Sequence, residues 1–325
     1  MDERGNILLI ANPGAQLGHA REASLAVCDM LSSKFGEERI VLKFASGFEE
    51  ARQIASDASP TFKTVIGIGG DGVLHFIAKG LMSIDVADRP TFGVIPVGNG
   101  NDYARSLGMS TDVKTAVGQI LNYPSLMTDV GLCNGIHFLE TLSFGIDAAI
   151  AIGTEDRRRA TGHTGTRLYL EEGVDQMLHH LKCRHTSAEF DGGVRVVYSG
   201  REIVSESQQV SQWHGQTVLF AVQIGPTYGG GFLVAPQAKL ADGVFDIALA
   251  KCPLTPLKAT RIFLKAKNGG HTKFKELEFY RARKIKVSFE CEDGVALPAQ
   301  VDGEKIEGTD FDIKILPRAL SVIRK

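Results

Sequence analysis

A glycine-rich stretch from Thr64 to Leu81, TVIGIGGDGVLHFIAKGL, constrains the fold of this chain more than any other. Its apolar beginning suits a buried strand, and a helical pattern starts near Val73. Between the two, the residues from Gly69 to Gly72 let the backbone approach a ligand with few Cβ atoms in the way. The helix would direct free N–H groups and the positive end of its dipole at that ligand. The stretch therefore predicts a phosphate-binding turn.

Asp71 is the unexpected residue in this turn. A carboxylate beside a phosphate is stable when a cation lies between the two groups, which indicates a magnesium nucleotide rather than a bare dinucleotide. The alternative is a glycine-rich connection that binds no ligand. A single run of glycines does not distinguish these two interpretations.

The composition limits the class of protein. The chain has 325 residues, of which 43% are hydrophobic and 23% charged, so it can form two domains with separate cores and lacks the composition of a disordered protein. The formal net charge is -2 and the pI is near 6.5. These values argue against a general nucleic-acid-binding protein, because no basic stripe dominates the sequence.

The cysteines and the N-terminal residues give indications of the cellular compartment. The chain has five scattered cysteines, Cys28, Cys133, Cys183, Cys252 and Cys291. This odd number without a C-x-x-C pair predicts neither a disulfide framework nor a zinc site and favours a reducing cytoplasm. The N-terminal residues form no recognisable export signal, and no segment approaches the roughly 18 apolar residues of a spanning helix.

The first part of the chain alternates strands with helices. Strands are expected at Asn6–Ala11, Arg39–Phe44, Lys63–Ile68 and Thr91–Pro96, and helices at Ala20–Phe35, Phe48–Ser56 and Asn101–Leu107. This alternation predicts an α/β domain over residues 1–130, with a parallel sheet covered on both faces. Ligands bind at the C-terminal ends of such strands, so the turns at Asn12–Gly14, Gly69–Gly72 and Gly98–Asp102 should converge on one site.

The second part of the chain, residues 131–314, is rich in short strands separated by Gly, Asp or Asn. Strands are expected at Phe138–Ser143, Val194–Ser199, Val218–Gly225, Val244–Lys251, Lys284–Phe289, Gln300–Asp302 and Phe311–Leu316, and helices at Arg167–Leu181 and Pro256–Lys267. The pattern predicts a C-terminal antiparallel β-sandwich domain.

Four motifs occur in a specific order along the chain. They are Asn12-Pro13 before a glycine, Gly69-Gly70-Asp71-Gly72, the run PVGNGNDYAR from Pro96 to Arg105, and Asp302-Gly303-Glu304. In this order they resemble the diacylglycerol kinase catalytic family, which includes bacterial soluble diacylglycerol kinases, related bacterial lipid kinases, sphingosine kinases and ceramide kinases. The resemblance covers nearly the whole chain.

The resemblance implies both a domain organisation and a reaction. It implies an NAD-kinase-like nucleotide-binding domain over residues 1–130, completed by residues 315–325, and a lipid-substrate domain over residues 131–314. It also implies ATP-dependent transfer of the γ-phosphate to a lipid hydroxyl, with Mg²⁺ as cofactor and diacylglycerol or a related lipid as acceptor. Such an enzyme would be cytoplasmic and would contact the membrane peripherally and transiently.

The resemblance also implies roles for individual residues of the first domain. Asp71 and Asp102 are the candidates to hold Mg²⁺ directly or through water. Asn101 is expected to fix the turn, and the preferences of helix N-caps give capping of the following helix about the same weight as a direct contact with the ligand. The candidate nucleotide-binding residues are Asn12, Pro13, Gly14, Ser46, Gly69, Gly70, Asp71, Gly72, Gly98, Asn99 and Asn101.

Three positions depart from the family pattern. Val73 and Asn99 stand where the family usually has hydroxyl residues, and Ser46 stands where it often has a threonine. Each change at Val73 and Asn99 removes a hydroxyl that could bond a phosphate oxygen, although an amide can still donate. These departures support the alternative of a non-enzymatic nucleotide-sensing protein.

Asp302 and Glu304 are the catalytic candidates of the second domain. On an extended segment these alternate positions would point both carboxylates to one side. By resemblance, Glu304 is the proton acceptor and Asp302 is its acidic neighbour. The alternative is a hairpin turn with the sequence Val-Asp-Gly-Glu.

A second metal site is implied by resemblance in the segment APQAKLADGVFD, which starts at Ala235. There Asp242 would bind Mg²⁺ through its side chain, and Lys239 and Val244 would bind it through backbone oxygens. A loop of this composition needs no metal. The preceding run from Tyr228 to Phe232 is expected to form a lip near the substrate site.

Two alternatives concern the partners. NAD kinases also carry a G-G-D-G turn, so a kinase of a soluble metabolite such as NAD competes with the lipid kinase. The cluster Arg157-Arg158-Arg159 and the stretch from Arg281 to Lys286 are interpreted as solvated charges by default, or else as contacts with anionic lipid headgroups.

Overall fold

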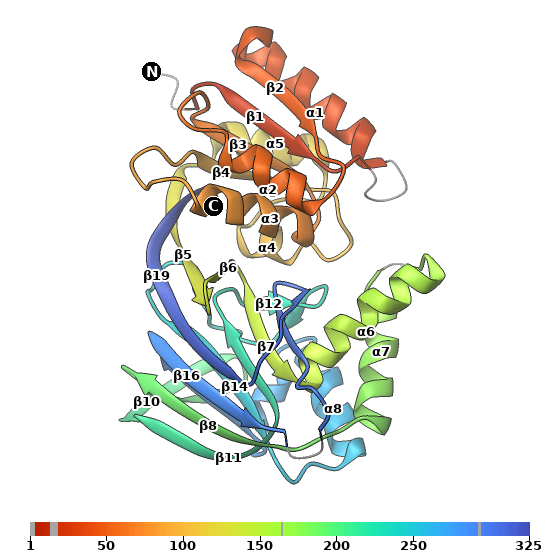
Figure 1. Ribbon diagram of the computed structural model, residues 1–325, viewed down its shortest axis with the longest axis vertical. Coiled ribbons are helices and arrows are strands. Elements are labelled where there is room, and N and C mark those ends of the chain that lie inside the picture. Colours follow the sequence, from red (N-terminus) through yellow and green to blue (C-terminus); the bar gives the residue numbers. More distant parts are fainter. Residues whose placement is uncertain (1–3, 14–18, 164, 292–293) are drawn as a thin grey trace. The chain divides into compact units, whose positions relative to one another are not determined.

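The computed structural model describes residues 4–13, 19–163, 165–291 and 294–325 (Figure 1). The chain divides into two compact units, the first comprising Met1–Val130 with Arg318–Lys325 and the second Gly131–Pro317. Each unit is described by itself below.

The first unit alternates strands and helices, as the sequence predicts. Its elements are β1 (Ile7–Ala11), α1 (His19–Phe35), β2 (Ile40–Phe44), α2 (Phe48–Ser56), β3 (Thr64–Gly69), α3 (Asp71–Met82), β4 (Thr91–Pro96), α4 (Asp102–Ser106), α5 (Val113–Asn122) and the beginning of β5 (Ser125–Cys133). A 3₁₀ turn at Glu37–Arg39 precedes β2.

A parallel sheet forms the centre of this unit. Strand β1 lies between β2 and β3, and β4 continues the sheet on the other side of β3. Strands β1 and β3 are buried along their whole length, which explains their unbroken apolar sequences. Helices α2 and α3 pack against each other, as do α1 and α5, so helices cover both faces of the sheet (Figure 1). The predicted α/β fold of this part is confirmed.

Helix α3 begins at Asp71, two residues before the start expected near Val73. Most of its side chains are buried, because α2 covers the side that faces away from the sheet. A Cβ atom on Gly80 would lie 2.2 Å from the carbonyl oxygen of Arg52, so this glycine permits the close approach of α2 and α3. The packing holds the start of α3, and with it Asp71, against the end of β3.

The second unit contains most of the strands of the chain. Its elements are β6 (Ile136–Phe138), β7 (Thr141–Gly145), α6 (Ile146–Thr161), α7 (Thr166–His179), β8 (Arg184–Asp191), β9 (Val194–Ser199), β10 (Glu202–Gln209), β11 (Gln212–Gln223), β12 (Thr227–Tyr228), β13 (Phe232–Leu233), β14 (Phe245–Lys251), α8 (Pro256–Ala266), β15 (Leu277–Ala282), β16 (Lys284–Glu290), β17 (Ala299–Val301), β18 (Glu304–Lys305) and β19 (Asp310–Ile323), with a 3₁₀ turn at Gly270–Lys273.

These strands form the predicted antiparallel β-sandwich. Strand β11 pairs with β7, β8 and β14, and β16 pairs with β8 and β19, all antiparallel. Burial alternates along β8, as expected for a strand with one face on the core. One core is aromatic, with the ring of Phe144 between 4.5 and 6.3 Å from the rings of Phe220, Phe289 and Phe311. The other lies where α6, α7 and α8 pack on the sheet.

Strand β19 is much longer than the expected strand at Phe311–Leu316. It begins in the second unit and ends in the first, where Val322 pairs in parallel with Phe92 of β4. Three further contacts hold this end in the first unit. The Arg318 amide donates to the carboxylate of Asp129, Arg89 donates to the carbonyl of Ala319, and Thr128 donates to that of Leu320.

The expectation that the cysteines form no disulfides is wrong for one pair. Cys183 and Cys252 form a disulfide that joins the segment after α7 to the loop before α8. They are 69 residues apart in the sequence, and only the fold brings their Cα atoms to 6.1 Å, a separation typical of disulfides. Cys28, Cys133 and Cys291 are free. An odd number of scattered cysteines gives no indication of such a long-range pair.

Candidate functional site

Two glycine turns meet at the C-terminal edge of the parallel sheet. A Cβ atom on Gly98 would lie 2.4 Å from the Cα atom of Gly70, so neither position accepts a larger residue without movement. The backbone of Val97 also donates to the carbonyl of Gly69 at 2.9 Å. The turn after β3 and the turn after β4 are therefore in direct contact, as the sequence predicts for these two.

Two carboxylates lie beside this contact. A Cβ atom on Gly100 would lie 2.6 Å from Oδ2 of Asp71 and 3.4 Å from Oδ2 of Asp102, so both carboxylates reach the same small space. The backbone N–H of Tyr103 donates to Oδ1 of Asp71 at 3.1 Å, which fixes that side chain across the two turns. Asp102 is 6% exposed. Arg105 donates to its carboxylate and, at 2.9 Å, to the carbonyl of Gly100.

Asn101 holds the second turn in shape. It adopts the left-handed conformation with φ of 54°, and its side-chain amide donates to the carbonyl of Gly98 at 2.8 Å. Its side chain makes no capping bond to α4, although its backbone carbonyl accepts from the Arg105 amide at 3.0 Å, so the structure favours the turn-forming role over side-chain capping. Its side-chain oxygen is buried and has no hydrogen-bond partner in the described structure. A buried acceptor of this kind costs stability unless a donor or cation reaches it.

The remaining predicted nucleotide-binding residues lie along the same sheet edge. Asn12 follows β1, and Ser46 follows β2, whose last residue Phe44 is the register partner of Ala11. The amide of Ser46 donates to the Glu50 carboxylate at 2.6 Å and its hydroxyl donates to the same oxygen, which lowers the pKa of Glu50. Pro13 is described, whereas Gly14 lies outside the described residues.

The positions that depart from the family pattern differ in burial. Val73 is 3% exposed and packs towards Gly69, so its side chain belongs to the core under the turn. Asn99 is exposed at the tip of the second turn. The Val73 side chain therefore contributes to packing and offers no hydrogen bond to a ligand. The side-chain amide of Asn99 is accessible and can still donate one.

These residues fit a magnesium nucleotide. The contact of Gly70 with Gly98 leaves a glycine-walled surface for phosphates, and α3 starts at this point with the positive end of its dipole. Asp71 and Asp102 supply the one or two carboxylates by which proteins usually hold Mg²⁺. Among the described residues no group of three or more His, Cys, Asp or Glu side chains could hold a metal, so phosphate and water oxygens would complete the coordination.

Asp302 lies in a hairpin turn, so the expectation of an extended segment is wrong. Val301 of β17 pairs with Glu304 of β18, and the two residues between them have positive φ angles of 44° at Asp302 and 87° at Gly303. The Asp302 carboxylate accepts hydrogen bonds from three consecutive amides, those of residues 139, 140 and 141, at 2.6 to 3.0 Å. The Asp-Gly sequence is typical of such a turn, in which alternate residues do not share a face.

Glu304 is half-buried at the start of β18. The hairpin that carries it is fixed by the Asp302 bonds and by Gln300, which accepts from the Gly303 amide and donates to Ser143, each at 2.7 Å. The structure thus gives Asp302 an anchoring function and leaves the proton-accepting role predicted for Glu304 as a hypothesis.

The segment proposed to hold a second metal is a series of turns before β14. Lys239 and Asp242 are exposed, and the Val244 amide lies 3.4 Å from Oδ1 of Asp242. The run from Tyr228 to Phe232 is the hairpin of β12 and β13, packed on Tyr169 rather than projecting as a lip.

A narrow apolar cavity of about 60 Å³ lies in the second unit, a feature that the sequence analysis missed. It is bordered by α6, α7 and α8, by the hairpin at Tyr228, and by the sheet. Its lining is almost wholly aliphatic and aromatic, including Tyr169, Met177, Phe232, Ile262 and Phe263. At about 10–15 Å³ per water it has room for roughly four to six water molecules, so a longer apolar ligand would have to part its walls.

Two buried polar side chains face this apolar cavity. Burial raises the pKa of Asp147 to about 6, although hydroxyls of Tyr228, Ser143 and Tyr169 donate to its carboxylate, and its Oδ2 has no partner in the described structure. Burial lowers the pKa of His271 to about 4, and Nε2 of this neutral imidazole donates to the carbonyl of Val234 at 3.0 Å. A carboxylate in the apolar run IDAAIAIG was the available sequence signal for this site.

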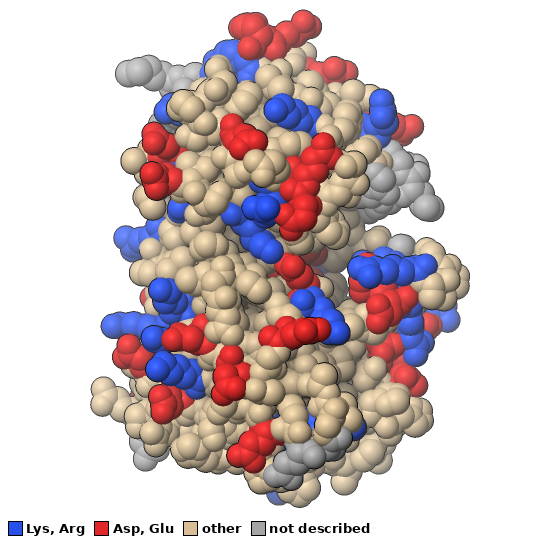
Figure 2. Space-filling model, in the orientation of Figure 1, with Lys and Arg blue, Asp and Glu red and all other residues tan. Residues whose placement is uncertain are grey.

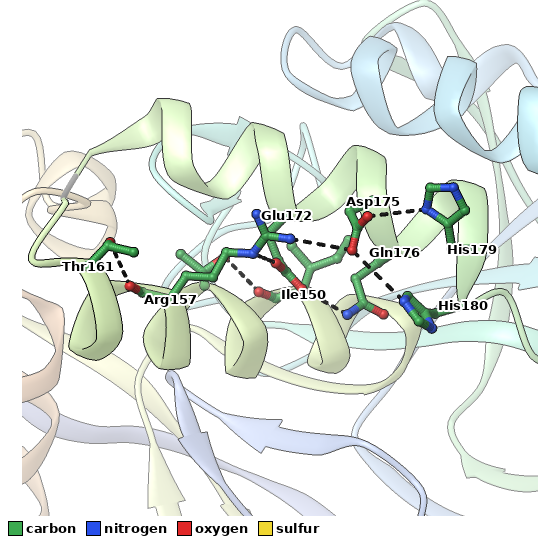
Figure 3. A network of polar contacts seen from close by, with 9 residues as sticks. Ile150, Arg157, Thr161, Glu172, Asp175, Gln176, His179 and His180 are labelled. Carbon is green, nitrogen blue, oxygen red and sulfur yellow. Dashed lines mark hydrogen bonds and ion pairs between the residues drawn. The ribbon is translucent and has the colours of Figure 1, made fainter.

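The arginine cluster on α6 is paired with acidic side chains, and Figure 3 shows the pairs of Arg157. Arg157 forms ion pairs with Glu172 and Asp175 of α7, and Figure 3 shows His179 turned towards the same Asp175, at 3.2 Å. Arg158 and Arg159 pair with Glu155 of their own helix. Glu172 is only 3% exposed, and Arg157 is the cation that pairs with this buried side chain. The pairs of Arg157 join α6 to α7.

Comparisons with known proteins agree with this division of the chain. Residues 6–133 match the diacylglycerol kinase catalytic domain, and residues 140–324 match the YegS C-terminal NAD kinase beta sandwich-like domain. The second match alone covers more than half of the chain.

The individual relatives have low sequence identity to this chain, but the matches extend over most of its length. A Bacillus subtilis (strain 168) protein named diacylglycerol kinase is 28% identical over 228 residues, 70% of this chain and 67% of its own. A Pseudomonas aeruginosa (strain UCBPP-PA14) protein named probable lipid kinase YegS-like is 26% identical over 277 residues, 84% of this chain and 80% of its own. The crystal structure of a diacylglycerol kinase from Bacillus anthracis str. Sterne superposes with a TM-score of 0.73 at 19% identity, covering 100% of this chain and 98% of that one. At that identity the likeness establishes the fold.

Proposed function

Because the chain belongs to the diacylglycerol kinase catalytic family, with a YegS-type C-terminal domain, we propose that it is an ATP-dependent lipid kinase. It would transfer the γ-phosphate of ATP to the hydroxyl of diacylglycerol or a related lipid. The observation that carries the proposal is the contact of the two glycine turns with the carboxylates of Asp71 and Asp102 beside it. Kinase relatives share the family, and this geometry suits the phosphates and Mg²⁺ that a kinase needs.

The residues of the first unit would bind and position the nucleotide. The backbone at Gly70 and Gly98 would lie against the phosphates without side chains in the way, and the amides at the start of α3 would donate to phosphate oxygens. Asp71 and Asp102 would hold Mg²⁺, which when bound neutralises charge on the phosphates. Arg105 would keep Asp102 in place and contribute positive charge near the site.

The residues of the second unit would serve the acceptor. Glu304 would take the proton of the lipid hydroxyl, and a positioned base of this type contributes about 10²–10⁴-fold in rate. Asp302 would hold the hairpin that presents Glu304. The apolar lining of the cavity supports a lipid over NAD, because an apolar chain that parts its walls would leave no polar group unpaired, whereas the many polar groups of NAD would be left unpaired there.

A radiolabelled ATP assay tests the proposal. The purified chain is incubated with Mg²⁺ and either mixed lipids in detergent, NAD, or no acceptor. We expect a phosphorylated lipid in the first reaction only. Formation of NADP would favour the metabolite kinase, and nucleotide binding without any turnover would favour the sensing protein.

A further inference from the structure

A long surface segment of the second unit carries only positive charge. Between Cys252 and Lys275 the sequence contains no Asp or Glu but six cations, Lys258, Arg261, Lys265, Lys267, Lys273 and Lys275. The whole chain has a formal net charge of -2, so this segment departs sharply from its surroundings. On the face shown in Figure 2, by contrast, acidic and basic side chains are interspersed.

Helix α8 forms the first half of this segment and has two apolar faces. Ala259, Ile262, Phe263 and Ala266 form the inner face, which is buried and lines the cavity. On the outer face, Leu257 and Leu264 lie seven residues apart, on the same side of the helix. Leu257 is 79% exposed and Leu264 is 49% exposed. Burial inside this chain explains only the inner face, so the outer leucines require another explanation.

The cations surround these two leucines. Arg261 and Lys265 lie on the exposed side of the helix near the two leucines, and Lys267 is the residue at its C-terminal end. All three are exposed. Lys258 is neutralised through an ion pair with Glu276 at 3.0 Å. Within the part of the chain that the structure describes, Arg261, Lys265 and Lys267 take part in no ion pair. The arginines of α6 differ in this respect, since acidic neighbours compensate each of them.

We propose that the outer face of α8 is the surface by which this protein docks on anionic lipid bilayers. Leu257 and Leu264 enter the boundary between headgroups and acyl chains, and Arg261, Lys265 and Lys267 bind lipid phosphates. Nucleic acid would satisfy the cations but would leave the leucines in water, so the pairing of both features favours a membrane. The docked helix lies between the bilayer and the apolar cavity on its inner face. That consequence rests on the proposed lipid-kinase function, whereas the docking itself does not.

Sedimentation with vesicles, without nucleotide, tests the docking. Vesicles contain phosphatidylcholine alone or with about one third phosphatidylglycerol. Replacing Arg261, Lys265 and Lys267 together with Gln should weaken binding to the anionic vesicles at least about tenfold, as salt should for the unchanged protein. The double variant Leu257→Ser, Leu264→Ser should weaken it by a similar factor, with less sensitivity to salt, because it removes apolar contact.

Matched controls use residues elsewhere on the surface. Lys34, Lys63 and Lys114 are also exposed, and replacing them with Gln changes the net charge equally. Val86 and Val204 are exposed apolar residues, and their change to Ser matches the leucine variant. Both controls should bind vesicles like the unchanged protein. A control that weakens binding as much as the α8 variants overturns the proposal.

A second measurement separates a membrane from nucleic acid. The variant Leu257→Trp should show a blue-shifted emission, quenched by brominated lipids, only with anionic vesicles. The same shift with single-stranded DNA, or no shift with either, contradicts the proposal. Phosphorylation of detergent-dispersed lipid should be unchanged in all α8 variants, so a docking failure with normal turnover leaves the kinase function standing.

Discussion

At the scale of single residues, the site depends on how two carboxylates are held. Asp71 begins α3 and is tied to the second turn by the Tyr103 amide, while Asp102 begins α4 and is tied by Arg105. Two carboxylates that reach the space beside Gly100 repel each other unless positive charge lies between them. Arg105 supplies part of that charge, and a bound cation would supply the rest.

We therefore expect Asp71→Asn to abolish Mg²⁺-dependent phosphoryl transfer without unfolding the chain. The amide oxygen can still accept from the Tyr103 amide, so the turn keeps its shape, but the negative charge that would hold the metal is lost. Steady-state turnover and circular dichroism measure the two effects. Asp88→Asn at an exposed site is the control. Normal turnover of Asp71→Asn would remove this residue from the metal site.

Substitutions at Glu304 and at Asp302 should affect turnover and stability differently, since the two side chains have different contacts. Glu304→Gln should retain ATP affinity within a few-fold and lose about two or more orders of magnitude in turnover, the scale of general-base catalysis. Asp302→Asn should lose turnover as well. It should also lower the free energy of unfolding by about 1–3 kcal/mol, because the charged acceptor of three backbone amides is weakened. Urea unfolding and turnover of both variants provide the data, and near-normal turnover of Glu304→Gln would exclude it as the base.

The raised pKa of Asp147 should make the stability of the chain depend on pH. Its pKa is about 6 in the folded chain against an ordinary 3.8, so between these values the unfolded chain loses the proton while the folded chain keeps it. Stability should fall as the pH rises from about 4 to 6, by about 3 kcal/mol for this group. Asp147→Asn should remove that part of the slope, and buried Asp246, whose pKa is also about 6, should retain the rest. Superimposable urea-unfolding profiles of both proteins from pH 4 to 8 would contradict this.

At the scale of elements, the sequence predicted those whose residues carry a local signal. The expected bounds of α2, β4 and β9 agree with the structure, and those of β1, α1 and α7 differ by one or two residues. Helix α6 was missed, because its apolar start continues the apolar pattern of β7. The contact of Gly70 with Gly98 was predictable in outline, since turns after neighbouring parallel strands meet. The apolar cavity was not, because it depends on how three helices pack on a sheet.

The disulfide is an element-level link with a measurable consequence. It closes a loop of 69 residues and fastens the end of α7 to the start of α8, two helices that border the cavity. Removing it by Cys183→Ser should lower the free energy of unfolding by roughly 2–4 kcal/mol, chiefly because the unfolded chain gains freedom. Cys28→Ser, at a free cysteine, is the control. Equal urea midpoints for Cys183→Ser and the unchanged protein, with and without dithiothreitol, would count against the link.

At the scale of the whole molecule, the chain crosses between its two units twice, in β5 and in β19. A single cut therefore cannot separate them, because the last eight residues belong to the first unit. Leu320, Val322 and Ile323 are fully buried there, although they follow the second unit in the sequence. The first unit is thus complete only when residues 318–325 have been made.

Truncation after Pro317 should unfold the first unit and spare the second. Loss of three buried aliphatic side chains costs about 1.5–3 kcal/mol each, which together approaches the whole stability of a typical domain. The pairing of Val322 with Phe92 and the bond from Arg318 to Asp129 are lost as well. Hydrogen exchange should show β3 and β4 unprotected in the truncated chain, with β8, β11 and β16 still protected, and ATP binding should be absent. Removal of Lys325 alone, whose side chain is exposed, should leave the protection of β3 and β4 in place, because it removes only a backbone bond to Leu107. If the truncated chain keeps its protection in β3 and β4, then the end of β19 is dispensable, and the first unit folds from its first 130 residues.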